Sequence, residues 1–194
     1  MIEEHANKIL DYWFNPDGNH DNKKWFINSK SYDDEIKEKF SEILALYENK
    51  KGIEWLKTKK TFLAYIIMMD QLSRHIYRDT VNAYKNDKKA LLIAEMGIDT
   101  YLYKLNGYEL LFAFMPYSHK ENSLYHIHAD KIIDEIKIKG DFNNKITNKI
   151  EKHYYGHKNI INTFGRFPKR NRNLNRVSTE LENKYLEAVK FNFY

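Results

Sequence analysis

The stretch that decides the fold is an apolar run with a polar end: Phe62-Leu63-Ala64-Tyr65-Ile66-Ile67-Met68-Met69, then Asp70-Gln71-Leu72-Ser73-Arg74-His75-Ile76-Tyr77-Arg78. From Thr61 onward it predicts a helix that is apolar on most faces and therefore central in the fold. Asp70 and Arg74, like Arg74 and Arg78, lie one helical turn apart and share a face. Charges at the end of a buried helix need partners. We therefore expect this helix to end in a polar network.

Apolar residues recur at helical spacing in most other segments, and no segment alternates as a strand would. The fold class is therefore predicted to be all-α, with seven or eight helices in antiparallel hairpins and a single domain over 1–194. The predicted helices span 2–14, 31–51, 61–78, 87–105, 108–115, 124–138, 146–164 and 178–191.

Composition narrows the class of protein. The chain has 194 residues, a formal charge of +5 and no cysteine, which excludes disulfides, thiolate metal sites and cysteine nucleophiles. The apolar run that begins at Phe62 is shorter than the roughly 20 residues that span a bilayer, and the N-terminus lacks an apolar signal core. We expect a cytoplasmic protein without a membrane partner.

A basic stretch carries the surplus of positive charge: Phe164-Gly165-Arg166-Phe167-Pro168-Lys169-Arg170-Asn171, continuing to Arg176 and Ser178-Thr179-Glu180. From Lys152 to Thr179 the chain has Lys and Arg residues but no Asp or Glu. Three interpretations stay open. The loop binds a small anion through bidentate arginine contacts, it binds nucleic acid through backbone phosphates, or its arginines tie the loop to carboxylates and buried carbonyls.

Several motifs together resemble a known family. They are Asp11-Tyr12-Trp13-Phe14, Trp25-Phe26, Asp70-Gln71-Leu72-Ser73-Arg74, Met115-Pro116-Tyr117 with His119 and Glu121, and the Phe164–Asn171 block. In this order they resemble the bacterial domain-of-unknown-function family nine-two-four over nearly the whole chain. The resemblance implies a fold similar to tetratricopeptide-type (TPR-like) helical hairpins and assigns no activity.

The resemblance also implies which polar residues form a site. The ligand-binding candidates are Asp70, Gln71, Arg74, Arg78, Glu121, Arg166, Arg170, Asn171 and Arg176. The chain departs from the family pattern at Ser73-Arg74-His75 (usually Pro-Arg-Asn), Lys120 (Ser), Asn159 (Asp), Lys169 (His) and Asn175 (Gly).

His119 and His157 are the catalytic candidates, because histidine titrates near neutral pH and can move protons. The alternative is a pair of hydrogen-bonded, half-buried histidines. Glu121 either orients His119 or caps the helix that begins near Asn122. The sequence contains no serine-nucleophile motif, phosphate-binding glycine loop or dinucleotide fingerprint, so no cofactor is predicted.

The spacing of the histidines also suggests a metal site. His153 and His157 are one helical turn apart, and His126-Ile127-His128 lies nearby in sequence. His153 and His126 do not match family positions, and no glutamate follows His153 to form a hydrolase signature. We predict no metal.

The leading functional hypothesis is a helical binding module with an Arg/His-lined polar site for an anionic small molecule or acidic peptide. An enzyme that uses histidine as general acid/base on a small phosphate- or carboxylate-bearing substrate is the alternative. Non-specific nucleic acid binding is the second alternative. The sequence predicts no particular substrate and no oligomeric state.

Overall fold

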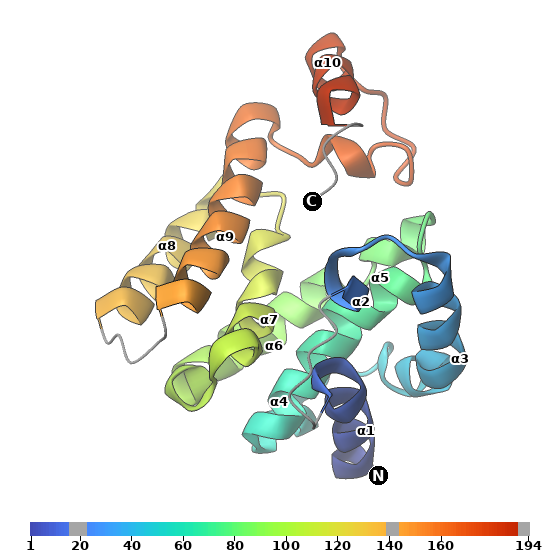
Figure 1. The fold of residues 1–194 in the computed structure, drawn as a ribbon, viewed down its shortest axis with the longest axis vertical. Helices are drawn as coiled ribbons and strands as arrows, with labels where there is room; N and C mark the ends of the chain where they lie inside the picture. The colour runs from blue at the N-terminus through green and yellow to red at the C-terminus, as the bar shows by residue number, and fades with distance from the viewer. Residues whose placement is uncertain (16–22, 139–143, 190–194) are drawn as a thin grey trace. The chain divides into compact units, whose positions relative to one another are not determined.

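The computed structural model describes residues 1–15, 23–138 and 144–189, and every regular element within these ranges is helical (Figure 1). The all-α prediction is confirmed. Eight of the α-helices in these ranges have eight residues or more, in agreement with the predicted number. The α-helices are α1 (Ile2–Phe14), α2 (Lys23–Phe26), α3 (Lys30–Tyr47), α4 (Lys59–Ile66), α5 (Ser73–Ile76), α6 (Asp87–Tyr101), α7 (Gly107–Ser118), α8 (Ser123–Ile138), α9 (Asn144–Phe164) and α10 (Glu180–Val189).

Shorter helical turns connect them: η1 (Ile53–Lys57), η3 (Val81–Tyr84), η4 (Leu102–Lys104) and η5 (Pro168–Arg170) are 3₁₀ turns, and η2 (Ile67–Leu72) is a π-helix. The chain divides into two compact units. Unit 1 comprises residues 1–78 and 82–116, and unit 2 comprises residues 79–81 and 117–194. The single-domain and TPR-like assignments stay predictions.

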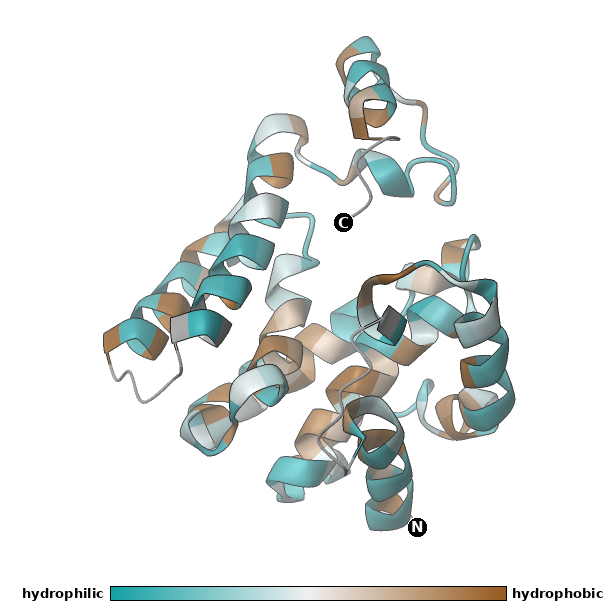
Figure 2. Ribbon diagram, viewed as in Figure 1, coloured by the Kyte–Doolittle hydropathy of each residue, from teal (hydrophilic) through white to brown (hydrophobic). Residues whose placement is uncertain are grey.

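The apolar run forms the centre of unit 1, as predicted. Every residue from Thr61 to Ser73 is buried, and α4 packs against α1 on one side and α6 on another. Figure 2 shows the hydrophobic residues of unit 1 gathered along α4. The expected stripe on α3 is buried as well: Ile36, Phe40, Ile43, Leu44 and Tyr47.

The central helix changes geometry at the point where its sequence turns polar. The α-helical hydrogen bonding of α4 gives way to the π-helix η2, which contains Asp70 and Gln71, before α5 resumes. The hydroxyl of Ser73 donates to the carbonyl oxygen of Met69 at 2.5 Å inside this segment. A π-turn inserts an extra residue into the helix and is often found at functional sites. Hydrophobic spacing predicts an uninterrupted helix here and does not reveal this turn.

Close helix contact in unit 1 depends on a glycine in α6. A Cβ added at Gly97 would lie 2.5 Å from Cδ2 of Phe62 in α4. The small residues Ala90 and Ala94 lie on the same helix and are fully buried. Small residues at these positions therefore let α4 approach α6 closely.

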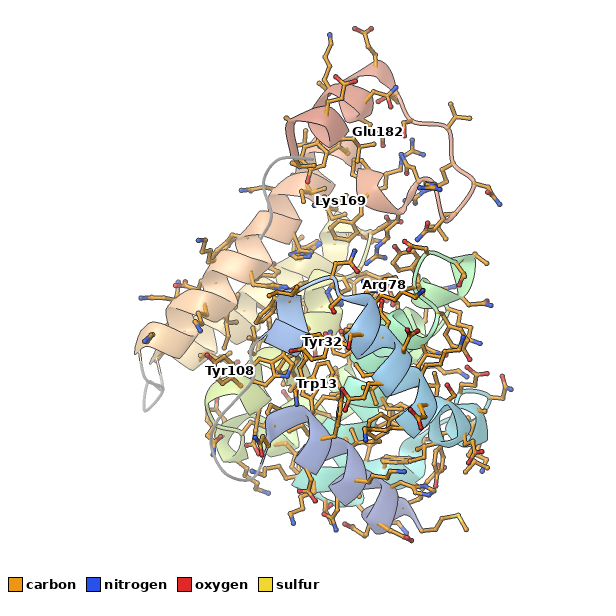
Figure 3. All side chains as sticks on the ribbon, turned by 45° about the vertical axis from the view of Figure 1, so that its right-hand side comes forward. Trp13, Tyr32, Arg78, Tyr108, Lys169 and Glu182 are labelled. Atoms are coloured by element: carbon orange, nitrogen blue, oxygen red, sulfur yellow. The ribbon has the colours of Figure 1, made fainter. Side chains whose placement is uncertain are left out.

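An aromatic cluster anchors the segment before α3. Trp25 is 6% exposed, and its indole N–H donates to the carbonyl oxygen of Trp13 at 3.0 Å. Its ring lies 5.0 Å from Phe112 and 4.8 Å from Tyr108. Trp13 and Tyr108, two of the residues that Trp25 contacts, are labelled in Figure 3. Trp25 is therefore part of the hydrophobic core, whereas its neighbour Phe26 is 44% exposed.

Unit 2 is built on a hairpin of α8 and α9, which lie side by side (Figure 1). Tyr154 of α9 is fully buried, and its hydroxyl donates to the carbonyl oxygen of His126 at 2.7 Å and to Oδ1 of Asp130 at 3.0 Å. These bonds fix the register of α9 against α8. The basic loop and α10 follow.

Several helix boundaries differ from the prediction. Helix α7 continues through Pro116 to Ser118, so Pro116 does not end it. Proline in the last turn of a helix removes one backbone hydrogen bond without unwinding the turns before it. At the N-terminus of α10 the cap is Thr179 rather than Ser178. The backbone N–H of Thr179 donates to Oε2 of Glu182 at 2.7 Å, and the N–H of Glu182 donates to Oγ1 of Thr179 at 3.2 Å.

Helix α3 begins at Lys30 after its N-cap Ser29 and ends at Tyr47, whereas the prediction was 31–51. The proposed helix end at Gly140 and the end of the last helix near Phe191 lie outside the described residues. None of the helices in the described ranges combines the length and the apolar character that crossing a bilayer requires.

Candidate functional site

The predicted site residues fall into two sets, one in each unit. Unit 1 holds Asp70, Gln71, Arg74 and Arg78, and unit 2 holds His119, Glu121, His157, Arg166, Arg170, Asn171 and Arg176. Each set is described separately.

In unit 1, Arg74 joins two carboxylates. Its Nη2 lies 3.3 Å from Oδ1 of Asp70, a side chain with no solvent exposure, and 2.9 Å from Oδ1 of Asp87. Burial acts to lower the pKa of Arg74, but the charges of Asp87 and Asp70 outweigh it and raise that pKa. The predicted Asp70–Arg74 pair therefore forms, and Arg74 also binds Asp87, the first residue of α6.

The π-turn places Gln71 between this pair and α7. Its amide nitrogen donates to Oδ2 of Asp70 at 2.5 Å and contacts the sulfur of Met115 at 3.3 Å. One oxygen of Asp70 thus accepts from the Gln71 amide and the other from the Arg74 guanidinium. Both oxygens of this fully buried carboxylate therefore have hydrogen-bond donors.

Arg78 pairs with a residue that the sequence did not single out. Its Nε and Nη2 donate to both oxygens of Asp33 in α3, at 2.5 and 2.9 Å. Nδ1 of His75 lies 2.8 Å from the same carboxylate, and burial lowers the pKa of His75. The position of Asp33 in the sequence gives no sign of this tertiary role.

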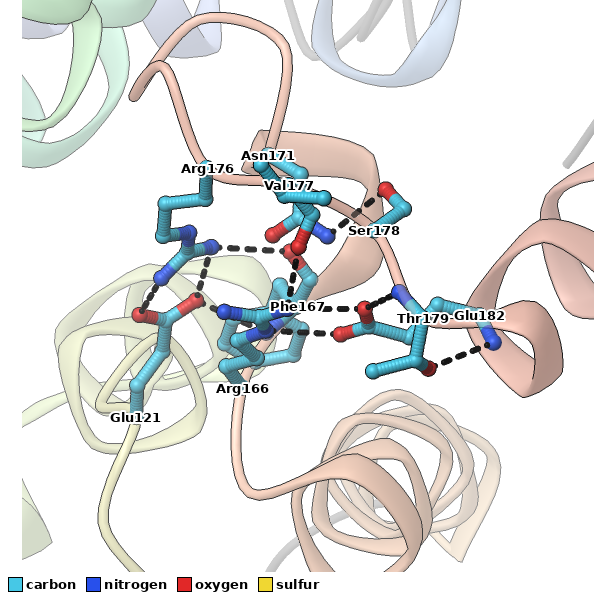
Figure 4. Close-up of polar contacts among 9 residues, drawn as sticks. All are labelled: Glu121, Arg166, Phe167, Asn171, Arg176, Val177, Ser178, Thr179 and Glu182. Carbon is cyan, nitrogen blue, oxygen red and sulfur yellow. Dashed lines mark hydrogen bonds and ion pairs between the residues drawn. The ribbon is translucent and has the colours of Figure 1, made fainter.

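In unit 2, Arg166 is bound to Glu182 (Figure 4). Its Nε and Nη2 donate to the two carboxylate oxygens at 2.6 and 2.8 Å, and Nη2 also donates to the carbonyl oxygen of Val177 at 2.9 Å. These hydrogen bonds from Arg166, with the cap bond from Thr179, lower the pKa of Glu182 to about 2. Arg166 therefore ties the start of the loop to α10.

Arg176 closes the other end of the loop on Glu121. The guanidinium donates to the two carboxylate oxygens at 2.7 and 3.1 Å and to the carbonyl oxygen of Phe167 at 3.1 Å. The backbone N–H of Phe167 also donates to Glu121, at 2.7 Å (Figure 4). Burial acts to raise the pKa of Glu121, and the bonds from Arg176 and Phe167 outweigh it and lower that pKa.

Glu121 therefore holds the loop. The N-terminus of α8 is capped instead by Asn122, whose Oδ1 accepts from the backbone N–H of Leu124 at 2.9 Å. The prediction that Glu121 caps this helix is replaced by the role of Asn122. Asn171 is buried, and its amide donates to the hydroxyl of Ser178 at 3.0 Å. Of the three interpretations of the arginine loop, the tie to local carboxylates and carbonyls holds for Arg166 and Arg176, and Arg170 is likewise tied to the carbonyl oxygen of His119.

The same loop has a turn that favours glycine. Asn175 has a φ of 52°, in the left-handed region where a Cβ is strained and asparagine is among the tolerated residues. This geometry accounts for the glycine that the resembled family has at this position.

His119 and His157 lie together, as the predicted site required. Their ring centroids are 5.6 Å apart, and His153 joins them, with its ring 4.4 Å from that of His157. Nδ1 of His157 lies 2.8 Å from the carbonyl oxygen of His153, so it is the protonated nitrogen that donates. The Nε2 atom of neutral His157 therefore carries the lone pair.

Burial is the main cause that lowers the pKa of His157 to about 2, and the neighbouring His153 and His119 rings and the charge of Arg170 add to it. His157 is therefore neutral at physiological pH and is a weak base. The assignment of His119 and His157 as acid/base catalysts stays a prediction.

Arg170 lies at the edge of this cluster. Its Nη2 donates to the carbonyl oxygen of His119 at 3.1 Å, and its guanidinium carbon lies 4.5 Å from the ring centre of Phe167. The ring of Phe167 in turn contacts His157, at 5.4 Å between centroids. Unit 2 thus brings together a guanidinium, an aromatic ring and histidine side chains from α7–α8 and α9.

Residues 9–189 match the family described as "Bacterial protein of unknown function (DUF924)". The chain belongs to this family. Nearly all of the described helices fall inside the matched range, and membership confirms the resemblance drawn from the motifs. The family description assigns neither a ligand nor a reaction.

A solved relative has the same fold. The protein of unknown function ATU0120 from Agrobacterium tumefaciens is 26% identical, with a TM-score of 0.79 over 97% of this chain and 99% of that one. The comparison with curated proteins found no match. Family membership and the shared fold thus extend over both units.

Proposed function

We propose that this family member is a binding protein for a small anion, a phosphate or carboxylate group of a small molecule or an acidic peptide, held in unit 2 by Arg170 beside His119 and His157. The observation that carries the proposal is the placement of Arg170. The bond to the His119 carbonyl and the contact with the Phe167 ring orient the guanidinium next to the histidine cluster. An oriented guanidinium is well suited to bidentate recognition of carboxylate or phosphate.

The electrostatics of the loop support the same ligand class. Arg166 and Arg176 are neutralised by Glu182 and Glu121 and serve to hold the loop in shape. Lys169 and Arg172 are exposed on the same loop as Arg170. Their charges add a positive field that favours the approach of anions.

The residues of unit 1 serve a different purpose in this proposal. Arg74 and Arg78 are bound to Asp70, Asp87 and Asp33. These ion pairs support the buried end of the central helix, and we assign them no ligand. The anion site is therefore smaller than the set of residues that the sequence predicted.

The test is a titration of the full chain with inorganic phosphate, acetate, a mononucleotide and an acidic peptide. Binding is measured by isothermal titration calorimetry and by the shift of the melting temperature. Arg170→Gln is the test variant. Arg172→Gln is the matched control, because it removes the same charge from an exposed position of the same loop. We expect saturable binding by the parent and the control, and at least tenfold weaker binding by Arg170→Gln.

A flat response to all four ligands would contradict the proposal, as would equal binding by the two variants. If both variants instead weaken DNA or RNA binding equally, and affinity falls steeply with salt, the nucleic acid alternative is favoured. Turnover of a bound phosphate or carboxylate compound that is lost in His119→Ala would favour the enzyme alternative.

A further inference from the structure

Three histidines of unit 2 form a cluster with metal-ligand spacing. His119, His153 and His157 each offer one ring nitrogen, and these three nitrogens all lie within 4.8 Å of one another. In a tetrahedral zinc site with Zn–N bonds of about 2.05 Å, ligand nitrogens are about 3.3 Å apart. The separations in the cluster exceed this spacing by no more than about 1.5 Å.

The helical framework positions two of the three ligands. His153 and His157 are one turn apart on α9, and their rings are 4.4 Å apart and inclined by 31°. His119 follows the last residue of α7 and faces them from a separate segment, with its ring 6.1 Å from His153 and 5.6 Å from His157. Its backbone is held by the hydrogen bond from Arg170 to its carbonyl oxygen.

A second layer of contacts fixes the orientation of one ring. Nδ1 of His157 donates to the carbonyl oxygen of His153 at 2.8 Å, which leaves Nε2 as its ligand atom. Metal-binding histidines commonly donate their other ring N–H to a backbone carbonyl in this way, which sets the tautomer and the ring orientation. Phe167 packs on the same ring at 5.4 Å and restricts its rotation.

We propose that His119, His153 and His157 bind one divalent transition-metal ion of the zinc class, with a fourth coordination position left for water or an anionic ligand. An all-imidazole set favours zinc, copper or nickel over magnesium or calcium, which prefer oxygen ligands. Three protein ligands with one exchangeable position are the arrangement of catalytic zinc sites. This inference goes beyond anion binding, since it assigns a cation to the cluster.

The charge of Arg170 opposes a bare cation at this cluster. An anion in the fourth position would offset that repulsion by contacting both the metal and the guanidinium. The sequence predicted no metal because His153 and His126 do not match family positions and no glutamate follows His153. Nε2 of His126 lies 3.2 Å from the carbonyl oxygen of Lys120, and the third ligand comes from His119 instead.

The experiment is a titration of the full chain, free of any affinity tag and treated with chelator, with Co²⁺ and then Zn²⁺ alone. The buffer contains no phosphate or carboxylate, so the outcome does not depend on anion binding. We expect visible Co²⁺ absorption that saturates at one ion per chain and is displaced by Zn²⁺, and calorimetric Zn²⁺ binding with the same stoichiometry. Perturbed imidazole NMR signals should come from the three cluster histidines.

His153→Gln is the test variant, since it removes a ligand from a half-buried helical position and retains a helix-forming residue. His128→Gln is the control, because His128 is an exposed histidine of the same unit. We expect His153→Gln to bind at least tenfold more weakly and His128→Gln to match the parent. Far-UV circular dichroism checks that both variants retain their helices.

A second variant, His157→Asn, covers the case in which His153→Gln does not fold. The proposal is overturned if the parent shows no stoichiometric Co²⁺ or Zn²⁺ binding. It is also overturned if a folded His153→Gln or His157→Asn variant binds as tightly as His128→Gln.

Discussion

Replacing Glu182 with glutamine tests the ion pair that joins the basic loop to α10. The side chain of Glu182 is 3% exposed and accepts from Nε and Nη2 of Arg166 at 2.6 and 2.8 Å. It also accepts from the backbone N–H of Thr179. Glutamine can occupy the same position of a capping box, so Glu182→Gln removes the charge while keeping the cap.

The magnitude follows from the pKa of Glu182, which is about 2 in the folded chain. A carboxylate whose pKa is lowered on folding stabilises the folded state above its unfolded pKa and loses that contribution as the pH falls toward the folded value. With an unfolded pKa of about 4.3, the shift corresponds to at most about 3 kcal/mol at neutral pH. We expect about 2 kcal/mol, because Arg166 is partly exposed to solvent.

The assay must report on unit 2. The three tryptophans, Trp13, Trp25 and Trp55, all lie in unit 1, so their fluorescence does not follow α10. Amide hydrogen exchange of the α10 residues measures the opening free energy of that helix directly. Glu182→Gln should lower this free energy by about 2 kcal/mol at pH 7, and the difference from the parent should fall to about half near pH 3.2, midway between the two pKa values.

Glu180→Gln is the matched control, since Glu180 is in the same helical turn and its pair with Lys184 is largely exposed. It should change the opening free energy by less than about 0.5 kcal/mol. Equal effects of the two substitutions would refute the reasoning. So would a Glu182→Gln difference that stays constant between pH 7 and pH 3.

Substitutions at three further positions test the packing and backbone geometry. Gly97→Ala should destabilise unit 1 by about 1–3 kcal/mol in urea unfolding followed by tryptophan fluorescence, because the new Cβ meets Phe62; an unchanged midpoint would contradict this. Gly156→Ala, where a helical Cβ would have nothing within 4 Å, should instead stabilise α9 by about 0.5–1 kcal/mol in hydrogen exchange. At Asn175 the φ of 52° lies in the left-handed region, which glycine adopts freely and valine does not. In thermal unfolding, Asn175→Gly should therefore be neutral or slightly stabilising, and Asn175→Val should lower the unfolding free energy by at least about 1 kcal/mol. Equal melting temperatures for the two variants would count against the left-handed turn.

Helix patterning could be predicted well because it depends on local spacing. The stripe from Ile36 to Tyr47 and the apolar run from Phe62 to Met69 are buried where periodicity placed them. The errors lie at helix ends, at Pro116 and Thr179, where one backbone hydrogen bond decides the boundary. The π-turn over Ile67–Leu72 was also missed, since it leaves no trace in hydrophobic spacing.

The charged residues show where sequence reasoning fails. Spacing along one helix predicted the pair of Asp70 and Arg74. The partners of Arg78 and Arg166 are Asp33 and Glu182, which are 45 and 16 residues away, and no local rule pairs them. Ion pairs between segments depend on how helices pack, so the sequence supplied the arginines but not their roles.

For this protein, then, the sequence by itself determined an all-helical fold, its central helix, its family and a basic loop. These features are local or compositional, and residue spacing encodes them directly. Only the tertiary structure decided that carboxylates neutralise Arg166 and Arg176 while Arg170 lies beside histidines. It also brought His119 next to His153 and His157, because the packing of separate helices sets distances between residues that are far apart in sequence.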